Sequence, residues 1–113
     1  MPLIAIRALP QRDGVDVDAA LREVTHAVAT LIDGEPRGTW ATWATIERYV
    51  EGGEAATVQP RATHPPIVTL SAAPGRPQEE LLRCVAETLA RALELEPGNV
   101  WVRYDEVQPD ELA

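Results

Sequence analysis

Residues 65–107, PPIVTLSAAPGRPQEELLRCVAETLARALELEPGNVWVRYDEV, contain the pattern that decides the fold. The apolar run 67–73 ends at Pro-Gly, which is typical of a strand followed by a turn. An amphipathic helix is predicted next, with Pro77 as its first residue. Its apolar stripe is formed by Leu82, Val85, Leu89 and Leu93, with Leu81 and Ala86 beside them. Residues 99–107 alternate as a last strand. The segment therefore predicts a βαβ unit.

The first half of the chain predicts the same order of elements. Residues 3–9 alternate apolar and other side chains before a proline, as a strand does. Asp16 is a suitable N-cap for an amphipathic helix that ends before Gly34. Residues 39–50 are rich in Thr, Trp, Ile, Tyr and Val, which favours a second strand. The polar stretch 51–66 is expected to be a loop or a short hairpin, so the full order is βαββαβ.

The two halves have the character of a repeat. Pro2 and Pro66 each stand ten residues before an arginine, Arg12 and Arg76. We therefore expect one α+β (α/β-like) domain over residues 1–113, with pseudo-repeats 2–53 and 66–107. Right-handed crossovers would give a four-stranded, mostly parallel sheet with two helices on one face. The uncovered face of such a sheet is expected to be covered in a cyclic oligomer.

Composition excludes several classes of function. The chain has 113 residues and a net charge of −8, which disfavours nucleic acid and anionic membranes as partners. All basic residues are arginine, so Schiff-base chemistry on lysine is excluded. One cysteine and two histidines do not make a Cys/His metal site, and no cofactor is expected. Without a long apolar run or a signal-peptide pattern, the protein is expected to be cytoplasmic, with no membrane span.

Two features of the chain could carry chemistry. On the last strand, the Val-rich face should meet the helices, which leaves Trp101 and Arg103 together on the uncovered face. An arginine beside an aromatic wall suits a planar carboxylate ligand, although a subunit interface with an ion pair explains the same pattern. Removal of Met1 would leave Pro2 with a secondary amine, which desolvation and nearby arginines would make a base near neutral pH.

Met1-Pro2 followed directly by the strand LIAIRAL, a helix and a second βαβ unit resembles the tautomerase superfamily. The resemblance is to its fused two-unit members, which are similar to macrophage migration inhibitory factor, carboxymethyl-hydroxymuconate isomerase and the chloroacrylic acid dehalogenases. It covers most of the chain except residues 54–64. It implies a homotrimer and an isomerase, specifically a keto-enol tautomerase with an amino-terminal proline. The substrate would be a small 2-oxo or enol carboxylic acid.

The resemblance also implies roles for individual residues. Pro2 matches the catalytic proline, and Arg76, in preference to Arg12, matches the arginine that holds the substrate carboxylate. Trp101 and Arg103 match residues that line the pocket from a neighbouring subunit.

Further positions are implied less directly. Leu70 and Ser71 would lie on the strand beside the proline, and the second-strand arginine of the family is replaced near Thr42. Trp40 and Trp43 are three apart and should point to opposite faces of a strand, so only one can line a pocket; Trp43 is taken as a substrate-binding candidate.

Two alternatives stay open on the same scaffold. A haloacrylate dehalogenase or a semialdehyde decarboxylase would need a carboxylate that activates water, and Glu47 is the candidate for it. A non-catalytic ligand-binding module is the other alternative, because βαββαβ is also the element order of ferredoxin-like domains.

Overall fold

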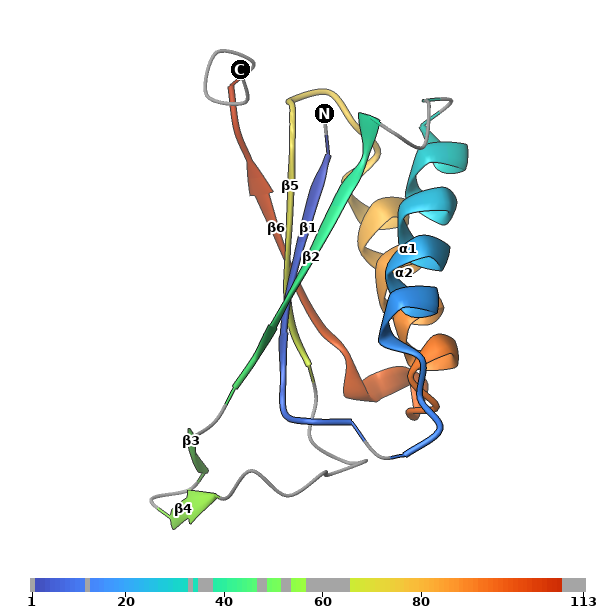
Figure 1. Ribbon diagram of the computed structural model, residues 1–113. Helices are drawn as coiled ribbons and strands as arrows, with labels where there is room; N and C mark the ends of the chain where they lie inside the picture. Colours follow the sequence, from blue (N-terminus) through green and yellow to red (C-terminus); the bar gives the residue numbers. More distant parts are fainter. Residues whose placement is uncertain are drawn as a thin grey trace.

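The structure is a computed structural model that describes residues 2–11, 13–32, 34, 38–46, 49–51, 54–56 and 66–108. Its elements in chain order are β1 (Leu3–Ala8), α1 (Val17–Leu31), β2 (Trp40–Thr45), β3 (Tyr49–Glu51), β4 (Glu54–Ala56), β5 (Ile67–Ala72), α2 (Gln78–Ala92), a 3-10 turn (Pro97–Asn99) and β6 (Trp101–Glu106). Figure 1 shows one layer of helices beside one layer of sheet.

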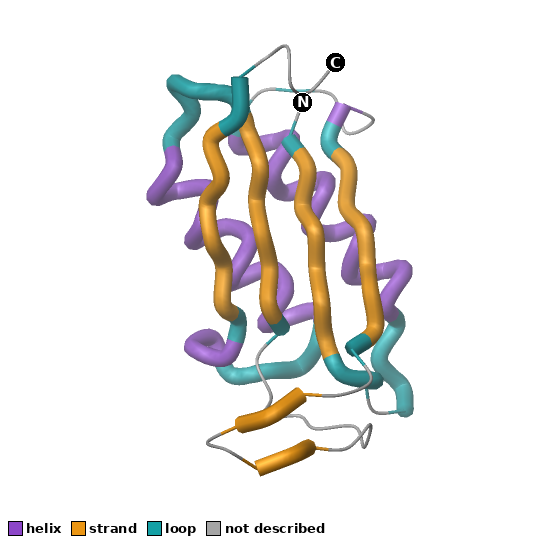
Figure 2. Tube along the Cα trace, turned by 90° about the vertical axis from the view of Figure 1, so that its left-hand side faces the viewer, coloured by secondary structure: helices purple, strands orange, loops and turns teal. Residues whose placement is uncertain are grey.

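The main sheet has the strand order β2-β1-β5-β6. β1 and β2 are parallel, β5 and β6 are parallel, and the central pair β1 and β5 is antiparallel. Figure 2 views the sheet from the side away from the helices, which all lie behind it. The prediction of a mostly parallel four-stranded sheet with both helices on one face is therefore confirmed.

Matching backbone contacts relate the two βαβ units. The N–H of Trp40 donates to the carbonyl of Pro2 at 3.0 Å, and the N–H of Trp101 donates to the carbonyl of Pro66 at 3.1 Å. At the other ends of the strands, the N–H of Ile46 donates to the carbonyl of Ala8, and the N–H of Val107 donates to the carbonyl of Ala72 in the equivalent way. Because β1 and β5 are antiparallel, the two units are related by a pseudo-two-fold axis through the middle of the sheet.

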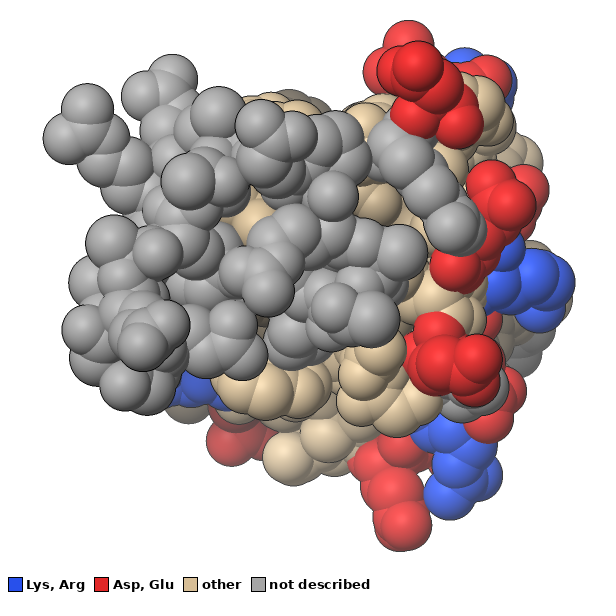
Figure 3. Space-filling view, turned by 90° about the horizontal axis from the view of Figure 1, so that it is seen from below, with Lys and Arg blue, Asp and Glu red and all other residues tan. Residues whose placement is uncertain are grey.

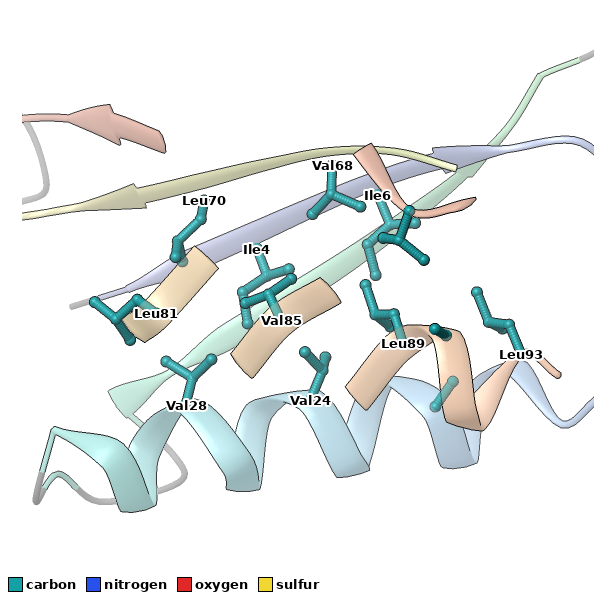
Figure 4. Close-up of a cluster of buried hydrophobic side chains, with 13 residues drawn as sticks. Ile4, Ile6, Val24, Val28, Val68, Leu70, Leu81, Val85, Leu89 and Leu93 are labelled. Atoms are coloured by element: carbon teal, nitrogen blue, oxygen red, sulfur yellow. The ribbon is translucent and has the colours of Figure 1, made fainter. Parts of the chain in front are cut away.

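The core lies between the sheet and the helices. Alternate residues of β1 and β5 face the helices and are fully buried, as the period of a strand requires. They meet one face of each helix, and Figure 4 shows these side chains pointing toward one another. The largest of them are Ile4, Ile6, Val24, Val28, Val68, Leu70, Leu81, Val85, Leu89 and Leu93. Burial of each such side chain contributes roughly 1.5–3 kcal/mol to folding.

The starts of the two helices differ. The carboxylate of Asp16 accepts a hydrogen bond from the N–H of Ala19 at 3.0 Å, which confirms the predicted N-cap of α1. Pro77 occupies the cap position of α2 instead of its first turn, so the predicted start was one residue early. Gly14 and Gly75 precede the two helices with positive φ of 93° and 88°, a conformation that favours glycine.

Three expectations about the elements need correction. The predicted strand 39–50 is divided, because β2 ends at Thr45 and β3 instead pairs with β4 in a hairpin beyond the lower end of the sheet in Figure 2. Leu81, which was predicted to lie beside the apolar stripe of α2, is fully buried, whereas Leu82 is only half-buried. Part of the predicted last strand is the 3-10 turn that precedes β6.

Neither helix of the described part of the chain has the length and hydropathy of a membrane span.

The units also differ in the connection from strand to helix. This connection spans residues 9–16 in the first unit and residues 73–77 in the second, so the second is three residues shorter. Arg12 and Arg76 stand equally far from the preceding strand but not from the following helix. The repeat therefore matches these arginines in sequence spacing from the strand only.

Candidate functional site

The two ends of the sheet hold different candidate residues. We call the end that holds Pro2, Ala72 and Glu106 the Pro2 end, and the end that holds Ala8 and Pro66 the Pro66 end. The strand register brings Leu3 opposite both Trp40 and Ser71, next to the Pro2 end. The same register brings Ile67 opposite both Arg7 and Trp101, next to the Pro66 end.

We call the sheet face away from the helices the open face. Its residues form three rows across the four strands, each row in the order β2-β1-β5-β6. The rows are Trp40, Leu3, Ser71 and Asp105; then Thr42, Ala5, Thr69 and Arg103; then Ala44, Arg7, Ile67 and Trp101. This grid locates each of the predicted open-face residues relative to Pro2.

Pro2 is buried at the start of a central strand. Its carbonyl is held by the N–H of Trp40, and Thr39, which precedes that tryptophan, is 5% exposed. The pairing of β1 with β2 therefore holds Pro2 in a fixed place at the end of the sheet.

Arg76 lies in the connection from β5 to α2, at the Pro2 end, and is exposed. Its charge acts on Tyr104, the half-buried residue that β6 places opposite Leu70 on the helix side of the sheet. Burial raises the pKa of the Tyr104 phenol, the carboxylate of Glu106 raises it further, and the guanidinium of Arg76 lowers it. A cation, a phenol and a carboxylate therefore gather near the Pro2 end.

Tyr104 and Glu106 were not among the residues selected from the sequence. The alternation of β6, which assigned Trp101 and Arg103 to the open face, also places Tyr104 and Glu106 on the opposite face. The parallel pairing of Ala72 with Glu106 then brings them to the Pro2 end. Strand pairing, which the sequence pattern alone did not provide, was the missing information.

The structure separates Trp101 from Pro2. Trp101 lies in the row next to the Pro66 end and is 62% exposed, while Arg103 lies in the middle row. Trp101 is level with Arg7, five residues from Pro2, which at about 3.3 Å per residue is roughly 16 Å along the strand. Within one chain, Pro2 and Arg76 share an end of the sheet, and Trp101 does not.

The predicted residues near Pro2 occupy two environments. Leu70 is fully buried among the core side chains, so it lies on the helix side of the sheet and not on the open face. Ser71 is half-buried on the open face, opposite Leu3.

The two tryptophans of β2 point to opposite faces, as their spacing predicts. Trp43 packs against the core on the helix side, whereas Trp40 is 56% exposed on the open face beside the Pro2 end. Of the two, the structure places Trp40 and not the selected Trp43 on the open face next to Pro2.

Arg12 and Glu47 lie outside the described residues. Gln11, immediately before Arg12, donates from its side chain to the carbonyl of Leu9, beyond the Pro66 end of β1. Ile46, immediately before Glu47, donates its N–H to the carbonyl of Ala8 at the same end. The described neighbours of both residues are therefore at the opposite end of the sheet from Pro2.

Acidic and basic side chains lie on the surface of the helices. They are visible in the view from the Pro66 end (Figure 3). Arg83 and Glu79 on α2 form an exposed ion pair at 3.6 Å. Within the described part of the chain, no group of His, Cys, Asp and Glu side chains has the arrangement of a metal site.

Known proteins resemble this chain in structure. No family model and no curated protein sequence matches the chain. The symmetric trimer of wild-type fused 4-OT matches with a TM-score of 0.73 and 14% identity, over 94% of this chain and 85% of that chain. N1, a member of the cis-3-chloroacrylic acid dehalogenase family, matches with a TM-score of 0.72 and 20% identity, over 98% and 78% of the two chains.

A third similar structure is the macrophage migration inhibitory factor-like protein from Entamoeba histolytica. It matches with a TM-score of 0.68 and 14% identity, over 96% of this chain and 90% of that chain. All three comparisons span nearly the whole chain and include both βαβ units. The chain therefore has the fold of the tautomerase superfamily.

Proposed function

We propose that the protein is an isomerase of the tautomerase type that uses the amine of Pro2 as a general base. The single observation that supports this proposal best is the burial of Pro2 at the start of a central strand, at the same end of the sheet as Arg76. The proposal includes removal of Met1, because a peptide-bonded proline nitrogen is not basic. The absence of lysine leaves no other side-chain amine for this role.

The proposed reaction is a proton transfer with one base. The neutral nitrogen of Pro2 takes a proton from the hydroxyl of an enol, or from the carbon next to a carbonyl, and becomes a protonated amine. The electron pair left on the substrate is shared along a dienolate. The protonated amine then returns the same proton to a different carbon, so the reaction needs no other proton donor and no cofactor.

The proposed role of the arginines is to bind the substrate carboxylate and stabilise the developing enolate oxygen. Arg76 is favoured because it is at the Pro2 end, where its guanidinium already influences the phenol of Tyr104. Charge-assisted hydrogen bonds that strengthen as charge develops lower the barrier of the reaction. Ser71 and Trp40 would line the open-face side of this site, because the strand register places both opposite Leu3.

Trp101 and Arg103 belong to this proposal only as residues of a second copy. They are far from Pro2 within one chain, so a homotrimer in which the Pro66 end of one copy approaches the Pro2 end of the next would complete the site. The fused 4-OT structure that matches this chain is itself a trimer. A small carboxylic acid bound at this junction would contact two subunits.

A dehalogenase is the second candidate. It is favoured by the match to N1, which covers 98% of this chain. Hydration of a haloacrylate needs a carboxylate to activate water, for which Glu47 is the candidate from the sequence and Glu106 is the one that the strand register brings to the Pro2 end. A semialdehyde decarboxylase is the related alternative.

The deciding experiment compares the two prolines that flank β1. Intact mass of the purified protein should show loss of Met1. Tautomerisation of phenylenolpyruvate and 2-hydroxymuconate should fall at least about a hundredfold in Pro2→Ala, which is the size of a general-base contribution. Pro10→Ala, which changes the proline that follows β1 at the other end, is the control and should keep the rate of the parent protein.

Equal rates for Pro2→Ala and the parent protein would exclude the proposed mechanism. Turnover of 3-chloroacrylate with release of chloride, in the absence of enol turnover, would instead select the dehalogenase.

A further inference from the structure

Thr39 is a buried polar residue beside Pro2. Its side chain is 5% exposed, and the only other polar side chain buried to this degree among the described residues is that of Thr88. Trp40, the next residue along the chain, donates its N–H to the carbonyl of Pro2 at 3.0 Å. The beginnings of β1 and β2 lie side by side (Figure 1), so Thr39 is the neighbour of Pro2 across this pair of strands.

Thr39 and Pro2 face the same side of the sheet. Side chains alternate along a strand, and Trp40 is on the open face, so Thr39 faces the helices. Pro2 stands two residues before the buried Ile4 and faces the same way. Both residues are covered within one chain, so their surroundings depend little on a neighbouring copy.

The hydroxyl of Thr39 lacks a hydrogen-bond partner among the residues that the structure describes. Thr25 on α1 is the contrasting case, since its half-buried hydroxyl donates to the carbonyl of Leu21 at 3.0 Å. A buried polar group without a partner costs free energy and is rare in native proteins. A partner is therefore expected from a group that forms only after the chain is processed.

The amine of Pro2 is such a group. While Met1 is attached, the nitrogen of Pro2 is an amide without a hydrogen and cannot donate. Removal of Met1 gives a secondary amine, which has one N–H and one lone pair when it is neutral. Neighbouring strands are about 4.8 Å apart, and the nitrogen and the hydroxyl oxygen are each within about 2.5 Å of their own Cα atoms. The two polar atoms can thus come within hydrogen-bond distance.

We propose that the hydroxyl of Thr39 accepts a hydrogen bond from the amine of Pro2 and so directs the lone pair of the nitrogen toward the substrate. This role rests on the proposed function, and it makes Thr39 a positioning residue, because Thr39 acts through Pro2 and does not touch the reacting atoms. When the lone pair takes the substrate proton, the amine has two hydrogens. One stays donated to Thr39, and the other is returned to the substrate carbon, so Thr39 keeps its own proton throughout.

The proposed hydrogen bond should change the basicity of Pro2. An acceptor stabilises the protonated amine more than the neutral amine, so Thr39 should raise the pKa of the Pro2 amine. Other titratable groups that the structure describes at this end lie on the connection to α2, on the first turn of α2 and on β6. They are Arg76, Glu79, Glu80, Tyr104, Asp105 and Glu106. All of them are retained when Thr39 is replaced, so a change in the pKa of the amine reports the hydroxyl.

The experiment uses two measurements. The first is the pH titration of the Pro2 amine in protein labelled with 15N-proline, with the resonance assigned by its absence in Pro2→Ala; it gives the pKa without a substrate. The second is kcat on phenylenolpyruvate. Thr39→Val, which replaces the hydroxyl by a methyl group, should lower the pKa of the amine by about 1 and kcat about tenfold.

Three further variants control for packing. Thr39→Ser keeps the hydroxyl and should retain the pKa and the kcat of the parent protein. Thr39→Ala lacks the hydroxyl and should behave like Thr39→Val, so it provides a second test if one variant does not fold. Thr88→Val makes the same change at the other buried threonine and should leave both values unchanged.

Each outcome distinguishes the role of Thr39 from the proposed function. An unchanged amine pKa in Thr39→Val, in protein that turns over the enol, would overturn the role of Thr39 and leave the isomerase standing. A lower amine pKa without any enol turnover would support the hydrogen bond and overturn the isomerase. Equal loss of kcat in Thr39→Val and Thr39→Ser would identify Thr39 as a packing residue only. Retention of Met1, detected by intact mass, would remove the donor and overturn both proposals.

Discussion

The backbone N–H of Trp101 donates to the carbonyl oxygen of Pro66 at 3.1 Å, and this bond fixes the exposed indole at the end of the sheet opposite Pro2. The equivalent bond beside Pro2 is made by Trp40. A tryptophan on the open face is therefore available at both ends of the sheet. Trp101, which the family resemblance associates with the substrate, is the one that is distant from Pro2 within the chain.

Complementation between subunits is the first prediction. Pro2→Ala and Trp101→Ala should each be poorly active, because each lacks one part of a site formed between two copies. After mixing at equal amounts and full subunit exchange, about one quarter of the sites should have an intact proline and an intact tryptophan, and activity should return to that level. Light scattering should give a trimer.

Activity that does not return on mixing would mean that the two residues do not share a site. A particle with the mass of one chain, 12.3 kDa, at micromolar concentration would exclude the homotrimer itself.

The second prediction concerns the arginines that follow the two central strands. Arg76→Ala should lower kcat/KM on an enol acid by roughly a hundredfold or more, because a charge-assisted contact to the carboxylate is lost in the transition state. Arg12→Ala and the control Arg22→Ala should have little effect. Stability should be preserved in Arg76→Ala and Arg22→Ala, because an exposed charge contributes only about 0–1 kcal/mol. A larger loss for Arg12→Ala would move the carboxylate site to the first unit.

The third prediction follows from the pKa of Tyr104, which burial raises above the usual tyrosine value. The tyrosine of the unfolded chain ionises first as the pH rises, so the folded state loses stability from about pH 10 upward. Tyr104→Phe should reduce this loss. The measurement is the urea midpoint between pH 8 and pH 11.

Cys84 affects the same pH range, because burial also raises the pKa of its thiol. The comparison is therefore made in a Cys84→Ala background. An identical pH dependence with and without the Tyr104 hydroxyl would show that the phenol ionises equally easily in both states.

The fourth prediction tests the N-cap of α1. Asp16→Ala should lower the free energy of unfolding by about 1 kcal/mol, because the N–H of Ala19 loses its acceptor. Asp13→Ala removes an exposed carboxylate from the preceding turn and is the control for loss of charge alone. Equal effects of the two substitutions in urea denaturation would mean that the hydrogen bond adds nothing beyond charge.

Local patterns predicted the elements where one physical requirement dominates. Alternation in β1 predicted a strand with two different faces, and one of these faces meets the helices. The prediction of one strand over 39–50 was right for residues 40–45 but wrong in its length, because strand propensity does not include the length of the partner strand. β2 pairs with β1 only as far as Thr45 opposite Ala8, shortly before Pro10, and the chain then leaves the sheet.

The candidate site was predictable only in part for the same reason. Pro2 and Arg76 could be selected one by one, and the fold does bring them to one end of the sheet. The separation of Trp101 from Pro2 depends on the antiparallel pairing of β1 with β5, which no local pattern contains. Glu106 and Tyr104 reach the Pro2 end through that same pairing.

The antiparallel centre of the sheet also makes a circular permutant informative. Pro2 and Val107 are at the same end of the sheet, with β5 between their strands, so a short linker of a few residues can join them. A chain reordered to begin at Pro66 would keep every strand neighbour of the main sheet. It would move the free proline amine from the Pro2 end to the Pro66 end of the sheet, beside Arg7 and Trp101. Enol turnover by this permutant would show that a terminal proline amine is sufficient for activity, and loss of turnover would show that the surroundings of Pro2 are also required.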